Sequence, residues 1–366
     1  MTQALFSLLS HILPTRPAVR DPRRIVLILP CCIGDVVLAT AALQALRRAY
    51  PQATIIWAVG GWSKPAIEQH NLLDGVIDTG ADALPVKSVG GMVRFIRQLR
   101  AGKFDLAVSL VRSPLMSVAV LLSGIPQRAG LDSGGRGFGY TIRAKVDPNL
   151  PRHEAEIYLD VARALGIDTT DCYANVPVTQ ADQDAVRAKL RSHGIDGAYL
   201  VVNPAGGRNP GMVMDAKRYP PEQLAELANR LAASLSAGIV VIGGRGDEML
   251  VAGVKDRLEG RTAAFVGDLS FGEIAALARD ARLYLGSDTG LTHLAAAAGA
   301  KTIMILGPSD PLRYAPFAAD ALALWKPTTI PRGGVAAGAP ADWNWARDGI
   351  SVEEAEARIR VWLGES

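Results

Sequence analysis

Residues 25–38 read Ile-Val-Leu-Ile-Leu-Pro-Cys-Cys-Ile-Gly-Asp-Val-Val-Leu. Five aliphatic residues in a row, Ile25–Leu29, are typical of a strand that is buried on both faces, as in a parallel sheet. Proline and small residues then lead the chain directly into an amphipathic segment, Val36–Tyr50, which ends before Pro51. A buried strand followed at once by a helix is the repeating unit of a doubly wound α/β domain.

The same alternation continues along the chain in two series, which a polar stretch at 168–182 separates. Repeated strand–helix units predict an α/β protein with two parallel sheets, each covered by helices on both faces. We place a first domain at 1–180, a second at 181–345 and a last helix within 346–366. Strands are expected at 25–29, 54–59, 75–78, 106–110, 199–202, 238–242, 263–265, 282–285 and 301–306, and helices at 36–50, 91–101, 114–123, 153–165, 182–193, 221–235, 247–258, 271–278, 291–298 and 352–363.

Composition indicates a folded, globular chain. The 366 residues are 49% hydrophobic and 20% charged, which excludes the disordered and collagen-like classes. The net charge is +3, from 39 basic and 36 acidic residues, so we expect no nucleic-acid partner. No apolar run approaches the roughly 18 residues of a membrane-spanning helix.

The three cysteines are too few for a disulfide framework, and adjacent Cys31 and Cys32 lack the spacing of a zinc site. We expect reduced thiols, as in a cytoplasmic protein. A redox role for the adjacent pair stays open, because both residues lie at the first strand–helix junction. We expect no metal site, since the one D-x-D pattern, at 182–184, lies far from any strand end.

The first 22 residues combine an apolar helical face with a following run of arginines. Two interpretations are open: a terminal helix packed on the first domain, or an interfacial helix in peripheral contact with an anionic membrane.

Asp35 follows Gly34 at the end of the first strand, where the helix begins. In parallel sheets ligands bind beyond the carboxyl ends of the strands. Asp35 is therefore either a helix-capping residue or a carboxylate that serves as a general base.

A second junction, Leu285–His293, reads Leu-Gly-Ser-Asp-Thr-Gly-Leu-Thr-His. The backbone N–H groups at such a helix start favour an anion, and Thr289 and His293 share one face of the first turn. Asp288, Thr289, Gly290, Leu291 and His293 are therefore candidates for holding a diphosphate, with a capping arrangement around a packed histidine as the alternative.

Two further loops carry candidate residues. Gly206 follows the strand at 199–202 and permits a close backbone approach, and Lys217, ahead of the next helix, can neutralise a phosphate. Glu248 follows a glycine-rich turn at 243–246 and can bind ribose hydroxyls. Glycine turns and solvated surface charges are the alternatives for both loops.

Together these motifs resemble glycosyltransferase family 9, the ADP-heptose:lipopolysaccharide heptosyltransferases. Ile33–Leu38 is similar to the first-loop motif of that family, and Lys217-Arg218-Tyr219-Pro220 to its Lys-Arg-Trp-Pro. Gly286–His293, followed by Gly307-Pro308-Ser309-Asp310-Pro311, closely resembles its most specific stretch. The resemblance implies a GT-B fold: two Rossmann-like domains facing a central cleft, with the last helix returning to the first domain.

The resemblance also implies a function. It predicts inverting, metal-independent transfer of a sugar, heptose from ADP-heptose, to a hydroxyl of a lipopolysaccharide-core or other cell-surface glycan or glycolipid, without a cofactor. Asp35 is then the general base, Lys217 and Asp288–His293 bind the diphosphate, and Glu248 contacts the ribose. Gly34, Arg112 and Arg128 are candidates for the acceptor side. The expected location is the cytoplasm, at the inner face of the cytoplasmic membrane.

Two other functions stay open. A nucleotide-sugar epimerase on the same fold would convert the donor without an acceptor. A non-catalytic GT-B protein would bind nucleotide sugar or glycan without turnover.

Overall fold

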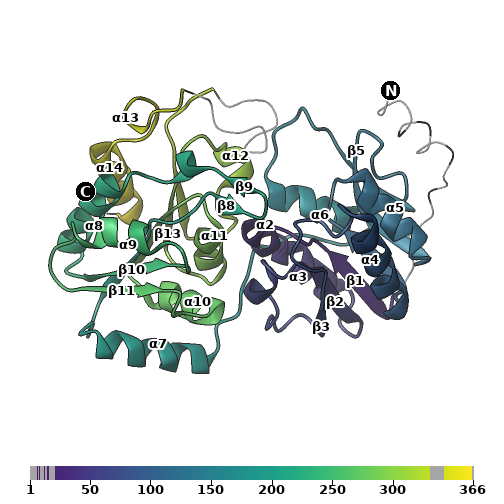
Figure 1. Ribbon diagram of the computed structural model, residues 1–366, viewed down its shortest axis with the longest axis horizontal. Coiled ribbons are helices and arrows are strands. Elements are labelled where there is room, and N and C mark those ends of the chain that lie inside the picture. The colour runs from purple at the N-terminus through teal and green to yellow at the C-terminus, as the bar shows by residue number, and fades with distance from the viewer. Residues whose placement is uncertain are drawn as a thin grey trace. The chain divides into compact units, whose positions relative to one another are not determined.

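The computed structural model describes Phe6, Leu8, Ile12, Thr15 and residues 21–329 and 342–364. The chain divides into two compact units, Met1–Ala174 and Asn175–Ser366 (Figure 1). The sequence places this boundary near residue 180, inside the same polar stretch. Each unit is built around one six-stranded parallel sheet, so the predicted α/β class is confirmed.

The sheet of the first unit has the order β3-β2-β1-β4-β5-β6. Its central strand β1 (Arg24–Ile28) is completely buried from Ile25 onward, as the aliphatic run predicts. The other strands are β2 (Thr54–Val59), β3 (Gly75–Asp78), β4 (Leu106–Ser109), β5 (Gln127–Ser133) and β6 (Ile142–Val146).

Helices cover the first sheet in two pairs. Helix α3 (Thr40–Ala49) packs against α6 (Glu154–Ala164), and α4 (Val89–Ala101) packs against α5 (Pro114–Leu122). Right-handed crossovers that leave β1 in opposite directions place their helices on opposite faces of the sheet. A short helix α2 (Ile33–Leu38) and a 3₁₀ turn η1 (Lys64–Ala66) complete the unit.

The helix expected at 36–50 is divided into α2 and α3. The division falls at Ala39, and the hydroxyl of Thr40 donates a 2.6 Å hydrogen bond to the carbonyl of Val37. A hydroxyl that bonds a nearby carbonyl competes with the regular backbone ladder. The short helix α2 follows β1 in the chain. It therefore lies beyond the carboxyl end of that strand, at the edge of the sheet where ligands bind.

The second unit repeats the same strand order, β11-β10-β7-β12-β13-β14. Its strands are β7 (Tyr199–Asn203), β10 (Gly238–Gly243), β11 (Thr262–Val266), β12 (Leu283–Ser287), β13 (Thr302–Ile305) and β14 (Ala321–Leu324), beside a small hairpin of β8 (Arg208–Asn209) and β9 (Met212–Val213). Its helices are α7 (Gln180–Ser192), α8 (Pro221–Ser234), α9 (Glu248–Lys255), α10 (Phe271–Asp280), α11 (Gly290–Ala297), α12 (Pro311–Tyr314), α13 (Trp345–Asp348) and α14 (Val352–Leu363), with a 3₁₀ turn η2 (Asp215–Lys217).

In each sheet the chain first adds strands on one side of its first strand and then on the other side. This winding reversal lies between β1 and β4 in the first unit and between β7 and β12 in the second. Ligands of doubly wound sheets bind outside the carboxyl ends of the strands at this point. In the first unit the residues just beyond these strands include 29–35 and 110–112. In the second unit they include 204–207 and 288–289.

Strands β5, β6 and β14 are absent from the sequence-based expectation. β5 reads Gln-Arg-Ala-Gly-Leu-Asp-Ser, without an aliphatic run. Its glycine, Gly130, lies under the ring of Tyr140, where a Cβ atom would approach ring carbons to 2.5 Å. The hydroxyl of Tyr140 then donates to Ser109 at the end of β4, 2.9 Å away. Tertiary packing therefore holds a strand whose sequence is polar.

The last helix differs from the expectation that it returns to the first domain. α14 packs on α8 and β14 of the second unit. Val352, Ala355 and Ile359 are buried in the hydrophobic core of that unit, together with Leu224 and Leu324. The segment that begins at Asn175 and ends with α14 therefore forms one compact body.

Of residues 1–22, where an interfacial helix is expected, the structure describes only Phe6, Leu8, Ile12, Thr15, Asp21 and Pro22. The ring of Phe6 stacks on Phe138 of the first unit, with ring centroids 5.9 Å apart, and Leu8 and Ile12 are exposed. The remainder of that expectation lies outside the described residues. Among the helices described, none has the length and apolar character needed to cross a membrane.

Candidate functional site

Asp35 lies in the first turn of α2, directly beyond the carboxyl end of β1. The helix begins after Cys32, whose carbonyl accepts a 2.9 Å hydrogen bond from the backbone N–H of Val36. Gly34 lies beside Asp35 in the same turn.

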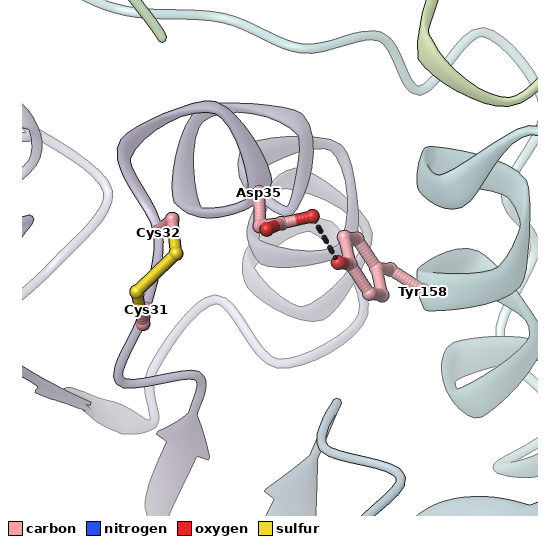
Figure 2. The surroundings of a disulfide bond; sticks show 4 residues. All are labelled: Cys31, Cys32, Asp35 and Tyr158. Atoms are coloured by element: carbon pink, nitrogen blue, oxygen red, sulfur yellow. Dashed lines mark hydrogen bonds between the residues drawn. A yellow bond between two sulfur atoms is a disulfide. The ribbon is translucent and has the colours of Figure 1, made fainter. Parts of the chain in front are cut away.

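Helix α6 supplies the partners of Asp35. The hydroxyl of Tyr158 donates a 2.8 Å hydrogen bond to Oδ1 of Asp35, as Figure 2 shows. One turn earlier on the same face, the buried carboxylate of Glu154 forms an ion pair with Arg112 from the β4–α5 loop. A phenol, two carboxylates and a guanidinium therefore gather at the winding reversal of the first sheet.

The surroundings of Asp35 raise the pKa of its carboxyl group above the ordinary value. Burial of the carboxyl group and then the negative charge of Glu154 raise its pKa from 3.8 to about 6. The hydrogen bond from Tyr158, the nearby backbone N–H of Cys32 and the positive charge of Arg112 lower the pKa and limit the rise. A carboxyl group with a pKa near 6 is mostly ionised at neutral pH and still basic enough to take a proton.

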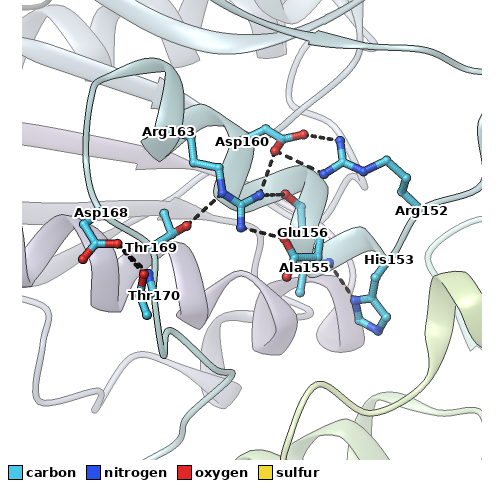
Figure 3. A network of polar contacts seen from close by, with 9 residues as sticks. All are labelled: Arg152, His153, Ala155, Glu156, Asp160, Arg163, Asp168, Thr169 and Thr170. Carbon is cyan, nitrogen blue, oxygen red and sulfur yellow. Dashed lines mark hydrogen bonds and ion pairs between the residues drawn. The ribbon is translucent and has the colours of Figure 1, made fainter.

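Ion pairs on the outer face of α6 link residues within the helix that carries Tyr158. Asp160 accepts from Arg152 at 2.6 Å and from Arg163 at 2.8 Å, and Arg163 also reaches Glu156 at 2.6 Å (Figure 3). Residues 156, 160 and 163 recur at helical spacing on this outer face, whereas 154 and 158 lie on the inner one. The network stabilises the helix itself, and its buried residues, among them Tyr158 and Val161, form the face that packs on the rest of the unit.

Cys31 and Cys32 are joined by a disulfide, where the sequence analysis expects reduced thiols. Both residues are partly exposed, on the loop that leads from β1 into α2. Figure 2 shows the disulfide at the start of α2, with the carboxylate of Asp35 directed away from it and toward Tyr158. The third cysteine, Cys172, is a buried free thiol.

In the second unit, the carboxyl end of β12 carries a buried ion pair. Nζ of Lys217 lies 2.6 Å from Oδ2 of Asp288, and Nε2 of His293 lies 4.0 Å from Oδ1 of the same carboxylate. Burial alone raises the pKa of Asp288, but the positive charges of Lys217 and His293 hold it below its usual range. Asp288 is therefore an ionised group that orients Lys217.

Hydrogen bonds draw the loops of this site together. The backbone N–H of Tyr219 donates to the hydroxyl of Ser287 at 2.9 Å, which fixes the segment after Lys217 on β12. The guanidinium of Arg218 donates to the carbonyl of Gly206 at 2.9 Å. Gly206 has φ +150° and approaches Thr289 so closely that a Cβ atom would lie 3.3 Å from the Thr289 Cβ. The predicted residues of three loops are thus neighbours.

The start of α11 presents backbone donors at the same edge. Thr289 is the N-cap and makes no side-chain capping hydrogen bond. The N–H groups of Thr292 and His293 donate to the carbonyl of Thr289. The N–H groups of Gly290 and Leu291 come too early in the helix to have a backbone acceptor within it. The positive end of α11 therefore faces the same edge as Lys217.

Glu248 begins α9, beyond the end of β10, which is the neighbour of β7. It is exposed, and its carboxylate accepts a 3.0 Å hydrogen bond from the N–H of Gly246. This backbone hydrogen bond lowers the pKa of Glu248. The residue shapes the glycine turn and lies at the edge that carries the Lys217–Asp288 pair.

Arg128 is the one candidate residue that lies neither at the sheet edge that carries Asp35 nor at the edge that carries Lys217 and Asp288. It lies near the amino end of β5, the edge opposite Asp35. Its guanidinium donates to the carbonyls of Gly139 at 2.8 Å and Ile125 at 2.7 Å, and so it supports the loop around Tyr140.

Sequence reasoning misses Tyr158 and Glu154 as partners of Asp35. Their spacing of four shows that they share a helix face, but nothing in the sequence links that face to a residue 123 positions away. Within the part of the chain that the structure describes, no group of three or more His, Cys, Asp or Glu residues is arranged to hold a metal ion.

The amino-acid sequence matches one protein-family model and several characterised proteins. The model of glycosyltransferase family 9 (heptosyltransferase) matches residues 92–332. Lipopolysaccharide heptosyltransferase 3 of Escherichia coli is 23% identical over 301 residues, 80% of this chain and 86% of the relative. Lipooligosaccharide heptosyltransferase 2 of Haemophilus influenzae is 25% identical over 309 residues, 81% of this chain and 86% of the relative.

Solved structures share the fold. A family 9 glycosyltransferase from Veillonella parvula matches with a TM-score of 0.79 and 23% identity over 96% of this chain and all of its own. Escherichia coli ADP-heptose lps heptosyltransferase II matches with a TM-score of 0.72 and 19% identity over 93% of this chain and 99% of its own. The arrangement of two doubly wound units is therefore the GT-B fold. Since the family model covers more than half of the chain, this protein belongs to glycosyltransferase family 9, the heptosyltransferases, and is a glycosyltransferase.

Proposed function

We propose that this glycosyltransferase moves heptose from ADP-heptose to a hydroxyl of a lipopolysaccharide-core glycan, with inversion and without a metal ion. Its curated relatives are lipopolysaccharide and lipooligosaccharide heptosyltransferases. One solved structure of similar fold is E. coli heptosyltransferase WaaC with ADP, at a TM-score of 0.65 and 18% identity over 93% of this chain and 99% of its own. These likenesses support the donor and acceptor classes.

Asp35 is the observation that carries the proposal. Its carboxylate is held at the winding reversal of the first sheet, and its pKa of about 6 suits proton transfer near neutral pH. In the proposed reaction Asp35 takes the proton of the acceptor hydroxyl as that oxygen attacks the anomeric carbon. The bond from this carbon to the diphosphate breaks, and ADP leaves with the electron pair.

The second unit would stabilise the leaving diphosphate. Lys217 supplies a positive charge, and the N–H groups of Gly290 and Leu291 supply donors at the positive end of α11. Asp288 and His293 orient Lys217, Gly206 allows the close approach of Thr289, and Glu248 is the proposed ribose contact. A lysine and a helix N-terminus together can replace the charge that a metal ion supplies in other transferases.

The acceptor side of the proposal rests on Gly34 and Arg112. Arg112 lies next to Glu154 at the Asp35 cluster, where its charge could attract an anionic glycan. Arg128 is left out of this proposal because its guanidinium supports a loop at the opposite edge of the sheet. A glycolipid acceptor would place the reaction in the cytoplasm, at the inner face of the cytoplasmic membrane.

The test is an in vitro transfer reaction with the full chain. Purified protein is incubated with ADP-heptose and a lipopolysaccharide-core glycolipid in the presence of EDTA, and ADP release and product mass are measured. We expect stoichiometric ADP and a product larger by one heptose, and NMR should show an inverted anomeric configuration. Conversion of ADP-heptose without an acceptor would indicate an epimerase, and binding without turnover would indicate a non-catalytic protein. Loss of transfer in EDTA, restored by a divalent cation, would contradict metal independence.

A further inference from the structure

The outer face of α4 in the first unit carries positive charges without acidic partners. Residues 84–104, which include this helix, contain no acidic residue and five exposed basic residues: Lys87, Arg94, Arg97, Arg100 and Lys103. On α6, α8 and α14, by contrast, carboxylates pair with the outward cations, as in Arg163–Glu156, Arg230–Glu226 and Arg360–Glu356. Among the residues that the structure describes, Lys87, Arg94, Arg97 and Lys103 make no ion pair. Their charge is therefore available to an external anion.

Exposed aliphatic side chains accompany these charges. Val89 and Val93, one turn apart on α4, are 83% and 40% exposed. Leu115 and Leu122, two turns apart on α5, are 50% and 49% exposed. Helices α4 and α5 pack side by side (Figure 1), and the guanidinium of Arg100 donates a 2.7 Å hydrogen bond to the carbonyl of Leu122. The exposed residues of the two helices therefore form one surface, the α4–α5 surface, in which aliphatic and basic side chains are mixed.

The α4–α5 surface begins at the sheet edge that carries Asp35. Helix α5 follows β4 in the chain, so its first turn lies beyond the carboxyl end of that strand. Leu115 lies in this turn, three residues after Arg112 of the Asp35 cluster. The surface thus extends from the edge proposed for the acceptor along the length of two helices.

We propose that the α4–α5 surface binds a bilayer that contains anionic phospholipids. Its cations contact the lipid phosphates, and Val89, Leu115 and Leu122 enter the boundary between head groups and acyl chains. This inference deepens the proposed function and rests on it for the glycolipid acceptor, which such a bilayer would hold close to Asp35.

The types of side chain favour a lipid surface over a nucleic acid. Nucleic-acid strands stack their bases on aromatic side chains, but the two aromatic residues of segment 84–104, Phe95 and Phe104, are buried. Aliphatic side chains beside a phosphodiester backbone stay in water, whereas a bilayer removes them from it. The combination of unpaired cations with exposed valine and leucine therefore fits an anionic membrane.

The test is sedimentation of the full chain with vesicles that contain no lipopolysaccharide. Phosphatidylcholine vesicles are compared with vesicles that also contain phosphatidylglycerol. We expect binding that requires phosphatidylglycerol and weakens as salt is added. Arg94→Gln, Arg97→Gln and Lys103→Gln combined should lower the partition coefficient about 100-fold, because each cation close to an anionic membrane contributes a factor of about five.

Matched variants separate the surface from net charge and from hydrophobicity in general. Arg191→Gln, Lys255→Gln and Lys301→Gln combined remove the same charge from exposed positions of the second unit and should leave binding unchanged. Leu115→Gln with Leu122→Gln should lower binding about 10-fold. Val361→Gln, at an exposed position of α14, should not. Circular dichroism checks that each variant folds.

Vesicle binding needs neither ADP-heptose nor an acceptor, so its outcome is independent of the proposed reaction. Binding that is lost in the α4 and α5 variants alone supports the surface even if no heptosyl transfer is found. Equal binding to both kinds of vesicle, equal loss in the two charge variants, or wild-type binding by the α4 variant would each overturn the proposal. A chain that binds oligonucleotides and not vesicles would also overturn it.

Discussion

The hydroxyl of Tyr158 donates a 2.8 Å hydrogen bond to Oδ1 of Asp35, although the two residues are 123 positions apart. Asp35 comes from the first strand–helix junction of the unit and Tyr158 from its last helix, α6. The hydrogen bond stabilises the ionised form of a carboxyl group that burial and Glu154 push toward protonation. Tyr158 therefore limits how far the pKa of Asp35 rises.

Replacing Tyr158 by phenylalanine should shift the pH dependence of transfer. Tyr158→Phe removes a donor to the carboxylate, so the pKa of Asp35 should rise above about 6. We expect the acid limb of kcat/KM to move up by about one pH unit, with little change at the plateau. Tyr140→Phe is the matched control, since Tyr140 is a buried tyrosine of the same unit that donates to Ser109. An unchanged limb in Tyr158→Phe would show that this hydrogen bond does not control the base.

Asp35→Asn should remove transfer and leave donor binding intact. Asparagine keeps the size of the side chain but cannot accept a proton, and general-base catalysis contributes about 10²- to 10⁴-fold to rates. We expect kcat to fall by that factor. The affinity for ADP, measured by calorimetry, should stay the same, because the proposed diphosphate site lies in the second unit. A variant with kcat near the wild-type value would remove Asp35 from the mechanism.

Asp35→Asn should also make the protein more stable above pH 6. The folded-state pKa of Asp35 is raised from 3.8 to about 6, so folding favours the protonated form. Stability from this group is fully present below pH 3.8 and is lost as the pH rises through about 6, by up to about 3 kcal/mol. Asparagine has no such loss. Denaturant unfolding should therefore show a gap between variant and wild type that is absent at pH 3.5 and largest at pH 8, and a gap independent of pH would argue against a raised pKa.

Replacing Lys217 should weaken ADP binding. Lys217→Met removes the proposed cation at the diphosphate and leaves the buried carboxylate of Asp288 without its partner 2.6 Å away. We expect ADP affinity to fall by about 10- to 100-fold, or about 1.4 to 3 kcal/mol. The same substitution destabilises the fold, so Lys217→Met with Asp288→Asn provides a variant without the unpaired charge.

Lys189→Met is the control for that experiment. Lys189 makes a similar 2.6 Å ion pair with Glu273, between α7 and α10 of the same unit. Its loss should leave ADP affinity unchanged. Equal affinity of the Lys217 variants and the wild type would place the diphosphate elsewhere.

Ile359→Ala tests the place of the last helix. Ile359 is completely buried in the core of the second unit, and truncating such a side chain costs about 2–5 kcal/mol. Val361 on the same helix is 78% exposed, so Val361→Ala should change stability by less than about 0.5 kcal/mol. Urea unfolding, with ADP protection as a reporter of the second unit, measures both. Equal effects of the two substitutions would contradict the packing of α14.

The α/β class, and the place of each candidate residue along its own strand or helix, follow from local sequence patterns. Apolar runs such as Ile25–Leu29 and Leu283–Leu285 mark buried strands, and the residues that follow them lie at one edge of a parallel sheet by topology. The motif Gly286–His293 and the residues around Lys217 were enough to identify the family. These features are local, so the periodicity and spacing of the chain encode them.

Contacts between residues far apart in the chain depend instead on tertiary packing. The polar strand β5 is held by the packing of Tyr140 over Gly130, and α14 joins the second unit through Ile359 rather than returning to the first. Tyr158 reaches Asp35 because α6 packs on α2 and α3 through the buried face that carries Tyr158. Such contacts depend on how complementary faces pack across long stretches of chain, and no local pattern of residues records that packing.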